Sequence, residues 1–134
     1  RFFCDTALAN GDEIDLPGVI RAKGHFWIAT RPNWVAEFSL AGAMSSVTPL
    51  GGWWISVPRE RWPSDREAVA KVMARWLEPW GDRRQEIVFI GAGMDRKGIE
   101  AMLDAALVPE REFVPERWAG LPDPFPSWRR EAAA

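Results

Sequence analysis

The chain has 134 residues, which fits a single domain, and 27% of them are charged, with a net charge of −2. This charge gives no electrostatic reason to expect nucleic acid or an anionic membrane as the main partner. No apolar run approaches the ~18 residues of a transmembrane helix. The single cysteine, Cys4, excludes an internal disulfide framework and fits a reducing, cytoplasmic setting. We therefore expect an ordinary globular protein with no nucleic-acid or membrane partner.

The composition along the chain suggests a folded middle with less regular ends. Residues 1–17 have no strong period and form a poorly defined lead-in. Residues 18–108 carry the patterns of a folded domain. Residues 109–134 are rich in proline, and this tail either is disordered or wraps the domain through Trp118, Phe125 and Trp128. Because the first residue is Arg1 and not methionine, we interpret the chain as a domain excised from a longer polypeptide.

The first half of the domain has the patterns of β-strands. Residues 18–30 are rich in β-branched and aromatic side chains and are punctuated by Gly24, which predicts two strands or one bent strand. A turn is expected at residues 31–33. The next segment predicts a half-buried antiparallel strand, because its larger apolar residues alternate on one face: Trp34, Ala36, Phe38 and Leu40.

Three further strands are expected. One lies near residues 45–48, and another crosses residues 53–57. The third, residues 87–90, is a continuous apolar run, which is typical of a strand covered on both faces.

Two helices are predicted from capping and periodicity. Ser64 and Glu67 match a capping box, in which each side chain satisfies a free backbone donor at the start of a helix. One apolar stripe follows this box: Val69, Val72, Met73, Trp76 and Leu77. Pro79 is expected to end this helix. The second helix is expected to begin at Asp95, with a stripe at Ile99, Met102, Leu103, Ala106 and Leu107.

This order of elements predicts an α+β domain. We expect a mainly antiparallel sheet with two principal helices packed on one face, followed by the proline-rich C-terminal tail.

The residue types that carry catalysis or bind metals are sparse. Residues 91–93, Gly-Ala-Gly, lie between a strand and a helix, but they complete neither a dinucleotide fingerprint nor a P-loop, so no nucleotide site is predicted. His25 is the only histidine and has no cysteine near it in sequence, which favours a packed strand residue over a metal ligand. We predict no catalytic residue, no metal site and no cofactor in this chain.

The densest mixed-charge cluster contains Asp82, Arg83, Arg84 and Glu86. Paired carboxylates can divide acid and base roles, but adjacent arginines keep both ionised, which suits salt bridges better than proton transfer. Structural bridging is therefore the favoured interpretation. Recognition of a partner is the alternative, because arginine forks bind carboxylates and phosphates.

The nine tryptophans, with no tyrosine, are unusual for this length. A domain this small cannot enclose nine indoles completely, so some are expected to be half-exposed. They pack either under proline-rich turns and against a neighbouring domain, or as a stacking platform for a ligand. Four residues would form such a platform: Trp53, Trp54, Trp62 and Trp80.

Three segments in order resemble the C-terminal domain of the CobW family, the metal-handling branch of the P-loop GTPases. They are residues 18–32 (GVIRAKGHFWIATRP), residues 53–63 (WWISVPRERWP) and residues 78–91 (EPWGDRRQEIVFIG). The resemblance covers roughly residues 18–108. It implies the α+β architecture described above.

The resemblance also implies a function for a longer parent protein. Family members couple GTP hydrolysis to delivery of a metal, zinc in many and cobalt in the cobalamin pathway. GTP, magnesium and zinc or cobalt are thus implied for the parent, through an N-terminal GTPase domain that this chain lacks. The Cys-x-Cys-Cys type metal motif associated with the family is absent from this sequence.

We therefore expect a non-catalytic accessory domain of a CobW-like GTPase metallochaperone. Its expected partners are the GTPase domain of the same protein and a metalloprotein client that receives the metal. Six residues are the candidate partner-binding set: Trp53, Trp54, Trp80, Asp82, Arg83 and Glu86. The alternative is a self-standing binding module with a tryptophan-lined ligand groove.

Overall fold

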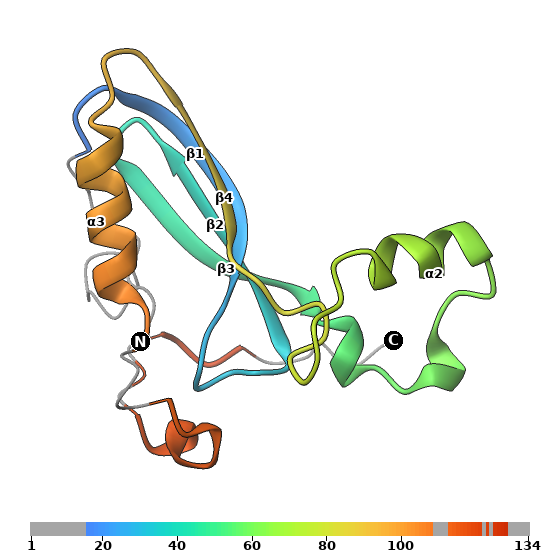
Figure 1. Ribbon diagram of the computed structural model, residues 1–134. Helices are drawn as coiled ribbons and strands as arrows, with labels where there is room; N and C mark the ends of the chain where they lie inside the picture. The colour runs from blue at the N-terminus through green and yellow to red at the C-terminus, as the bar shows by residue number, and fades with distance from the viewer. Residues whose placement is uncertain (1–15, 109–112, 122, 124, 129–134) are drawn as a thin grey trace.

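The computed structural model describes residues 16–108, 113–121, 123 and 125–128. Within them the chain forms one antiparallel sheet with strand order β3-β2-β1-β4 and two main helices, which confirms the α+β prediction (Figure 1). The strands are β1 (Val19–Trp27), β2 (Trp34–Ala41), β3 (Met44–Gly52) and β4 (Glu86–Gly91). The helices are α2 (Arg66–Met73) and α3 (Arg96–Ala106), with short 3-10 helices η1 (Trp54–Ser56), η2 (Arg59–Arg61) and η4 (Pro115–Gly120).

The expected lead-in, residues 1–17, lies outside the described residues except for Leu16 and Pro17. The expected tail, residues 109–134, is described only in part. In the described part Trp118 and Phe125 are buried, and Trp128 packs against the core.

The first strand is continuous. β1 runs from Val19 to Trp27 with one irregularity in its register between Val19 and Arg21. Of the two possibilities for residues 18–30, a single strand is therefore the one that forms. Gly24 lies in the middle of β1, between Phe38 of β2 and Ile87 of β4.

One face of the sheet carries the core. Side chains that alternate along the strands converge there, and α3 lies along this face (Figure 1). The predicted inward set of β2 is confirmed, because Ala36, Phe38 and Leu40 are buried. Asp95 caps α3 as predicted, since its carboxylate accepts a hydrogen bond from the Gly98 N–H at 3.1 Å.

The other face of the sheet is open. Among the strands of the described residues, β4 is an edge strand that pairs with β1 alone, and Val88 and Ile90 are 59% and 57% exposed. The expectation that β4 is covered on both faces was therefore wrong. Its apolar run packs one side into the core through Ile87 and Phe89 and presents the other to solvent.

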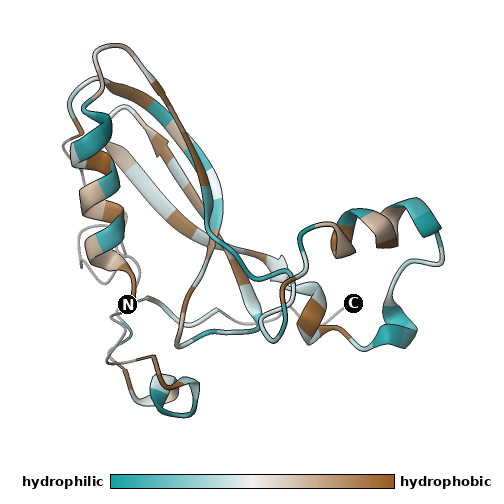
Figure 2. Cartoon of the chain, in the orientation of Figure 1, coloured by the Kyte–Doolittle hydropathy of each residue, from teal (hydrophilic) through white to brown (hydrophobic). Residues whose placement is uncertain are grey.

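Residues 54–80, which we call the arm, carry η1, η2 and α2 and extend beyond the end of the sheet (Figure 1). No residue of α2 is buried. Figure 2 shows hydrophilic residues at the outer end of this helix. Of the two main helices, it is thus α3 that lies along the sheet, while α2 belongs to the arm.

Three local predictions for the arm were wrong. Residues 53–57 do not form a strand but include η1, because a carboxylate from elsewhere in the chain occupies their backbone donors. Asp65, not Ser64, caps α2: its charged carboxylate, a stronger acceptor than a hydroxyl, binds the Glu67 N–H at 3.0 Å. The helix also ends at Met73.

Residues 74–77, which the apolar stripe placed in the helix, lie beyond the end of α2. Trp76 lies beyond the helix, and its ring packs against Trp62 with 5.6 Å between ring centroids. The chain reverses at Gly81, which has a φ of 70°, and a side chain at this position would collide with Ile55.

Candidate functional site

Asp82 joins the arm to the sheet. Its side chain is buried, at 5% exposure, and one carboxylate oxygen accepts a hydrogen bond from the Trp54 N–H at 2.9 Å. The other oxygen accepts from the Ile55 N–H at 3.0 Å. The first two backbone N–H groups of η1, which have no acceptor within the helix, thus both donate to the charged Asp82 carboxylate from a distant part of the chain. The carboxylate is therefore a structural anchor in this structure.

Arg83 also joins the segment before β4 to the end of the sheet. Its Nε donates to the Pro32 carbonyl oxygen at 2.8 Å, in the turn between β1 and β2. Its guanidinium also lies 5.6 Å from the centroid of the Trp27 ring. These contacts hold the segment before β4 against the end of the sheet.

Glu86 contacts basic side chains from three parts of the chain. Its Oε2 accepts from Arg75 Nη1 at 2.8 Å and from Arg84 Nε at 3.1 Å, and His25 Nε2 lies 4.0 Å away. The hydrogen bond from Arg84, followed by the charge of Arg75, lowers the pKa of Glu86. Burial, followed by the charge of Arg84, lowers the pKa of His25. The carboxylate is therefore ionised and the imidazole neutral near neutral pH.

Trp53 and Trp54, at the start of η1, have different surroundings. Trp53 is 3% exposed and meets His25 edge to face, with 5.8 Å between ring centroids. Its Nε1–H is buried without a hydrogen-bond acceptor among the described residues. Trp54 is half-buried and packs against Trp62, and Arg59 covers the Trp62 ring at 4.0 Å. These contacts form a small aromatic core inside the arm.

Trp80 belongs to a separate aromatic cluster. Its ring lies 5.4 Å from that of Trp27, 5.3 Å from Phe113 and 6.0 Å from Trp118. No ring contact joins it to Trp53 or Trp54 within the described part of the chain. A cavity of about 160 Å³ adjoins this cluster, lined in part by Trp27, Phe113 and Trp118.

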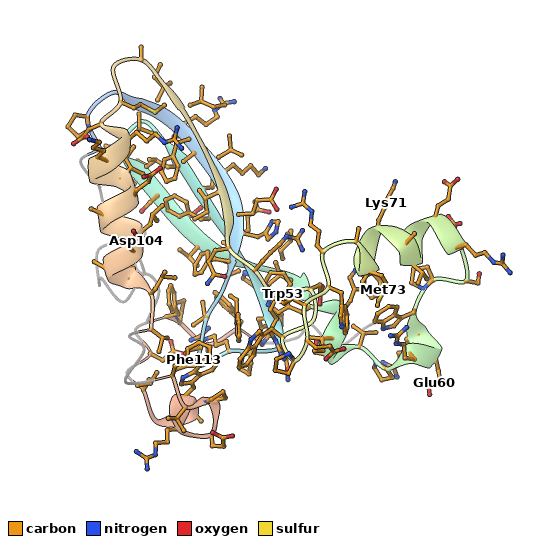
Figure 3. All side chains as sticks on the ribbon, in the orientation of Figure 1. Trp53, Glu60, Lys71, Met73, Asp104 and Phe113 are labelled. Atoms are coloured by element: carbon orange, nitrogen blue, oxygen red, sulfur yellow. The ribbon has the colours of Figure 1, made fainter. Side chains whose placement is uncertain are left out.

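The structure thus places the six candidate residues in two groups. Five lie at the junction of arm and sheet, which we call the root cluster: Trp53, Trp54, Asp82, Arg83 and Glu86. Figure 3 shows Trp53 at the end of the sheet nearest to the arm. Trp80 lies in the second aromatic cluster. Of the root cluster, Trp53 and Asp82 are buried, whereas Glu86 is exposed.

Sequence reasoning missed the contribution of α2 and its following turn to this cluster. Arg75 comes from eleven residues upstream of Glu86, and Lys71 faces the same region from α2. Lys71 and Arg75, four residues apart in the helix predicted from the sequence, indicate a basic side next to its apolar stripe.

A second anchor that the sequence did not reveal centres on Arg31. Its guanidinium binds Asp123 with two hydrogen bonds, 2.9 Å from Nε to Oδ2 and 3.0 Å from Nη2 to Oδ1. It also donates to the carbonyl oxygens of Phe125 and Pro126, and lies 4.5 Å from the Trp128 ring centroid. Ninety-two residues separate the two charged partners, so no sequence period could pair them.

The described residues include no group of three or more His, Cys, Asp or Glu side chains that could hold a metal ion. His25, one such ligand type, instead packs in β1 against Trp53. In the same described ranges no helix is long and apolar enough to cross a membrane. The root cluster presents charged and aromatic side chains that can contact another molecule.

The fold and this surface define a small α+β domain with an open sheet face and a projecting arm. The sequence model of the family described as "Cobalamin synthesis protein cobW C-terminal domain" matches residues 5–107. The chain therefore belongs to the CobW C-terminal domain family.

Two relatives with descriptive names share this region. The chain is 35% identical over 98 residues to "Zinc-regulated GTPase metalloprotein activator 1" of Dictyostelium discoideum, covering 72% of this chain and 20% of that protein. It is 32% identical over 117 residues to a protein of Mycobacterium tuberculosis named a zinc chaperone, covering 84% of this chain and 29% of that protein. The chain thus spans between a fifth and a third of the length of these relatives. No solved structure gave a significant match.

Proposed function

We propose that this chain is the non-catalytic accessory domain of a cytoplasmic, zinc-handling GTPase metallochaperone. In this role it contacts the GTPase domain of its parent protein or the metalloprotein that receives the metal. The family match and the names of the two relatives support the zinc and GTPase parts of the proposal. GTP, magnesium and the metal belong, in this proposal, to the remainder of the parent protein. Cobalt is the alternative metal, given the cobalamin-related family description.

The proposed contact with another domain is supported mainly by the arm, whose helix α2 has no buried residue. An isolated helix of eight residues with no buried side chain is marginal in water and gains stability from tertiary packing. Met73 at its end is 40% exposed, and the neighbouring root cluster presents Glu86 and half-buried Trp54. A neighbouring domain that covers this surface would complete the packing of α2.

The test measures GTP hydrolysis by the parent protein with a variant on this surface. Met73→Asp places a charge on the arm, and Met44→Asp makes the same change at an exposed methionine, 58% accessible, in the β2–β3 hairpin. A coupled domain predicts a changed hydrolysis rate or zinc transfer for Met73→Asp and an unchanged one for Met44→Asp. If both variants hydrolyse GTP and transfer zinc at the same rates as the unsubstituted protein, the proposal is wrong.

A second candidate, a self-standing module that binds an aromatic or apolar small molecule, is favoured by the cavity beside Trp27, Phe113 and Trp118. It predicts a tryptophan fluorescence change when such ligands are added to the isolated chain. Trp118→Leu would abolish that response, whereas the accessory role predicts no ligand response of the isolated chain.

A further inference from the structure

A cleft lies between the end of the sheet and the arm. Its volume is about 310 Å³, and its lining includes His25 of β1, Leu50 of β3, and Lys71 and Val72 of α2. Arg84, between the arm and β4, completes the basic part of the lining. Figure 3 shows Lys71 on α2 and Trp53 at the end of the sheet. We call this feature the arm cleft.

The arm cleft carries more cationic than available anionic groups. Two arginines, Arg75 and Arg84, share a single oxygen of Glu86. Asp82, the one carboxylate among the residues that line the cleft, is buried and directed at two backbone N–H groups. Lys71 is exposed and has no ion-pair partner in the described part of the chain. An incoming carboxylate would therefore meet unpaired positive charge.

The remaining lining of the arm cleft is apolar or aromatic. Val35, Leu50 and Val72 lie beside the basic groups, with half-buried Trp54. Trp53 also lines the cleft, and its indole N–H lacks an acceptor among the described residues. The cleft thus suits a ligand that joins acidic and apolar groups.

We propose that the arm cleft binds an acidic segment of a partner protein, with a carboxylate against Lys71 and Arg84 and an adjacent apolar side chain against Leu50 and Val72. The charge of the cleft and its apolar wall fit such a segment. A nucleic acid is disfavoured because the whole chain has a net charge of −2. This inference rests on the proposed function, since the segment belongs to the GTPase domain or to the client.

The probe is a short fluorescein-labelled peptide that alternates glutamate and leucine, titrated into the 134-residue chain at low salt. Two matched peptides replace glutamate by glutamine or by lysine. We expect the glutamate peptide to bind, the others to bind much more weakly, and added salt to weaken binding through screening. Equal binding of the glutamate and glutamine peptides would overturn the proposal, as would competition by inorganic phosphate as effective as that by the unlabelled peptide.

The variant is Lys71→Glu, with Lys97→Glu on α3 as the control. Both lysines are exposed and helical, but only Lys71 lines the arm cleft. We expect Lys71→Glu to weaken peptide binding about fivefold or more, since one ion pair is lost and one repulsion gained. Lys71→Gln should give a smaller loss and guards against misfolding of the charge-reversed chain. Equal affinities of the Lys71 and Lys97 variants would refute the site.

The two proposals fail in different ways. If Met73→Asp alters GTP hydrolysis by the parent while the acidic peptide does not bind, the arm-cleft inference is wrong and the accessory role stands. If the peptide binds as expected but no arm variant alters hydrolysis or zinc transfer, the cleft is a binding site and the proposed function is wrong.

Discussion

The carboxylate of Asp82 accepts a hydrogen bond from the backbone N–H of Trp54 at 2.9 Å, across 28 residues of sequence. This bond and its neighbour to Ile55 close the loop that contains the arm. The arm has no buried helix residue of its own, so its position depends on this closure. The position of the arm cleft, which lies between arm and sheet, therefore depends on a buried carboxylate.

Removing this anchor should destabilise the domain. Asp82→Ala leaves two backbone donors without their charged acceptor, which we expect to lower the free energy of unfolding by about 2–4 kcal/mol. Asp82→Asn retains an acceptor and should cost less. Urea denaturation followed by tryptophan fluorescence measures both. Asp104→Ala, at an exposed position of α3, is the control, and an Asp82→Ala loss no larger than this control would contradict the anchoring role.

Sequence reasoning succeeded where a local period coincides with the packing. The alternation of Ala36, Phe38 and Leu40 placed β2 correctly, because one face of that strand is fully covered. Asp95 was found as a helix cap because its partner, Gly98, is three residues away. Both signals depend only on neighbours within a few residues.

It failed where a distant group decided the local conformation. Residues 53–57 have the aromatic and β-branched composition of a strand, but Asp82 occupies the donors of Trp54 and Ile55. The run at residues 87–90 predicted burial on both faces, but Val88 faces solvent because no described element covers the second face of the sheet. Composition cannot tell whether another domain covers such a face.

The candidate site was predicted in a similar, partial way. The charge cluster pointed to Asp82 and Glu86, and the structure brings both to the root cluster with Trp53. The sequence does not distinguish the roles of these two carboxylates, because they differ in burial: Asp82 is buried and Glu86 is exposed. Whether the cluster binds a partner stays a prediction, which the peptide experiment addresses.

A second stability prediction concerns the clamp on the C-terminal segment. Arg31→Ala removes two hydrogen bonds to Asp123 and two to backbone carbonyls, at a site where the Arg31 and Asp123 side chains are 14% and 24% exposed. We expect a loss of about 2–4 kcal/mol in unfolding free energy and faster amide hydrogen exchange at Phe125. Hydrogen exchange with mass spectrometry reports the local effect. Arg117→Ala, exposed on η4, is the control, and unchanged exchange at Phe125 in Arg31→Ala would show that the clamp does not hold the segment.

A third prediction tests the close approach of β1 and β4. A Cβ atom on Gly24 would lie 2.1 Å from the Glu86 carbonyl oxygen and 2.5 Å from the Ile87 Cα. Both obstacles are backbone atoms, so Gly24→Ala must displace one strand, and we expect a loss of about 2–4 kcal/mol. Gly120→Ala is the control because nothing lies within 4 Å of its added Cβ. Thermal unfolding that gives the two alanine variants the same midpoint would contradict this strand packing.

The last prediction is a dependence of stability on pH that originates from His25. Burial, then the charge of Arg84, lowers its pKa below the ordinary value of 6.5, with Arg75 acting in the same direction and Glu86 and Glu37 opposing. The unfolded chain therefore binds a proton at a higher pH than the folded chain does. It follows that stability decreases as the pH falls from 6.5 towards the lowered pKa of the folded state.

Because His25 is the only histidine, a single substitution isolates this effect. Urea unfolding between pH 8 and pH 5 should show a decline for the parent chain and a flatter profile for His25→Gln. The lowered pKa values of Glu86 and Asp123 act in a separate window, below their ordinary values of 4.5 and 3.8, where protonation removes their contribution. An equally steep decline in both chains above pH 5 would mean that His25 is not the titrating group.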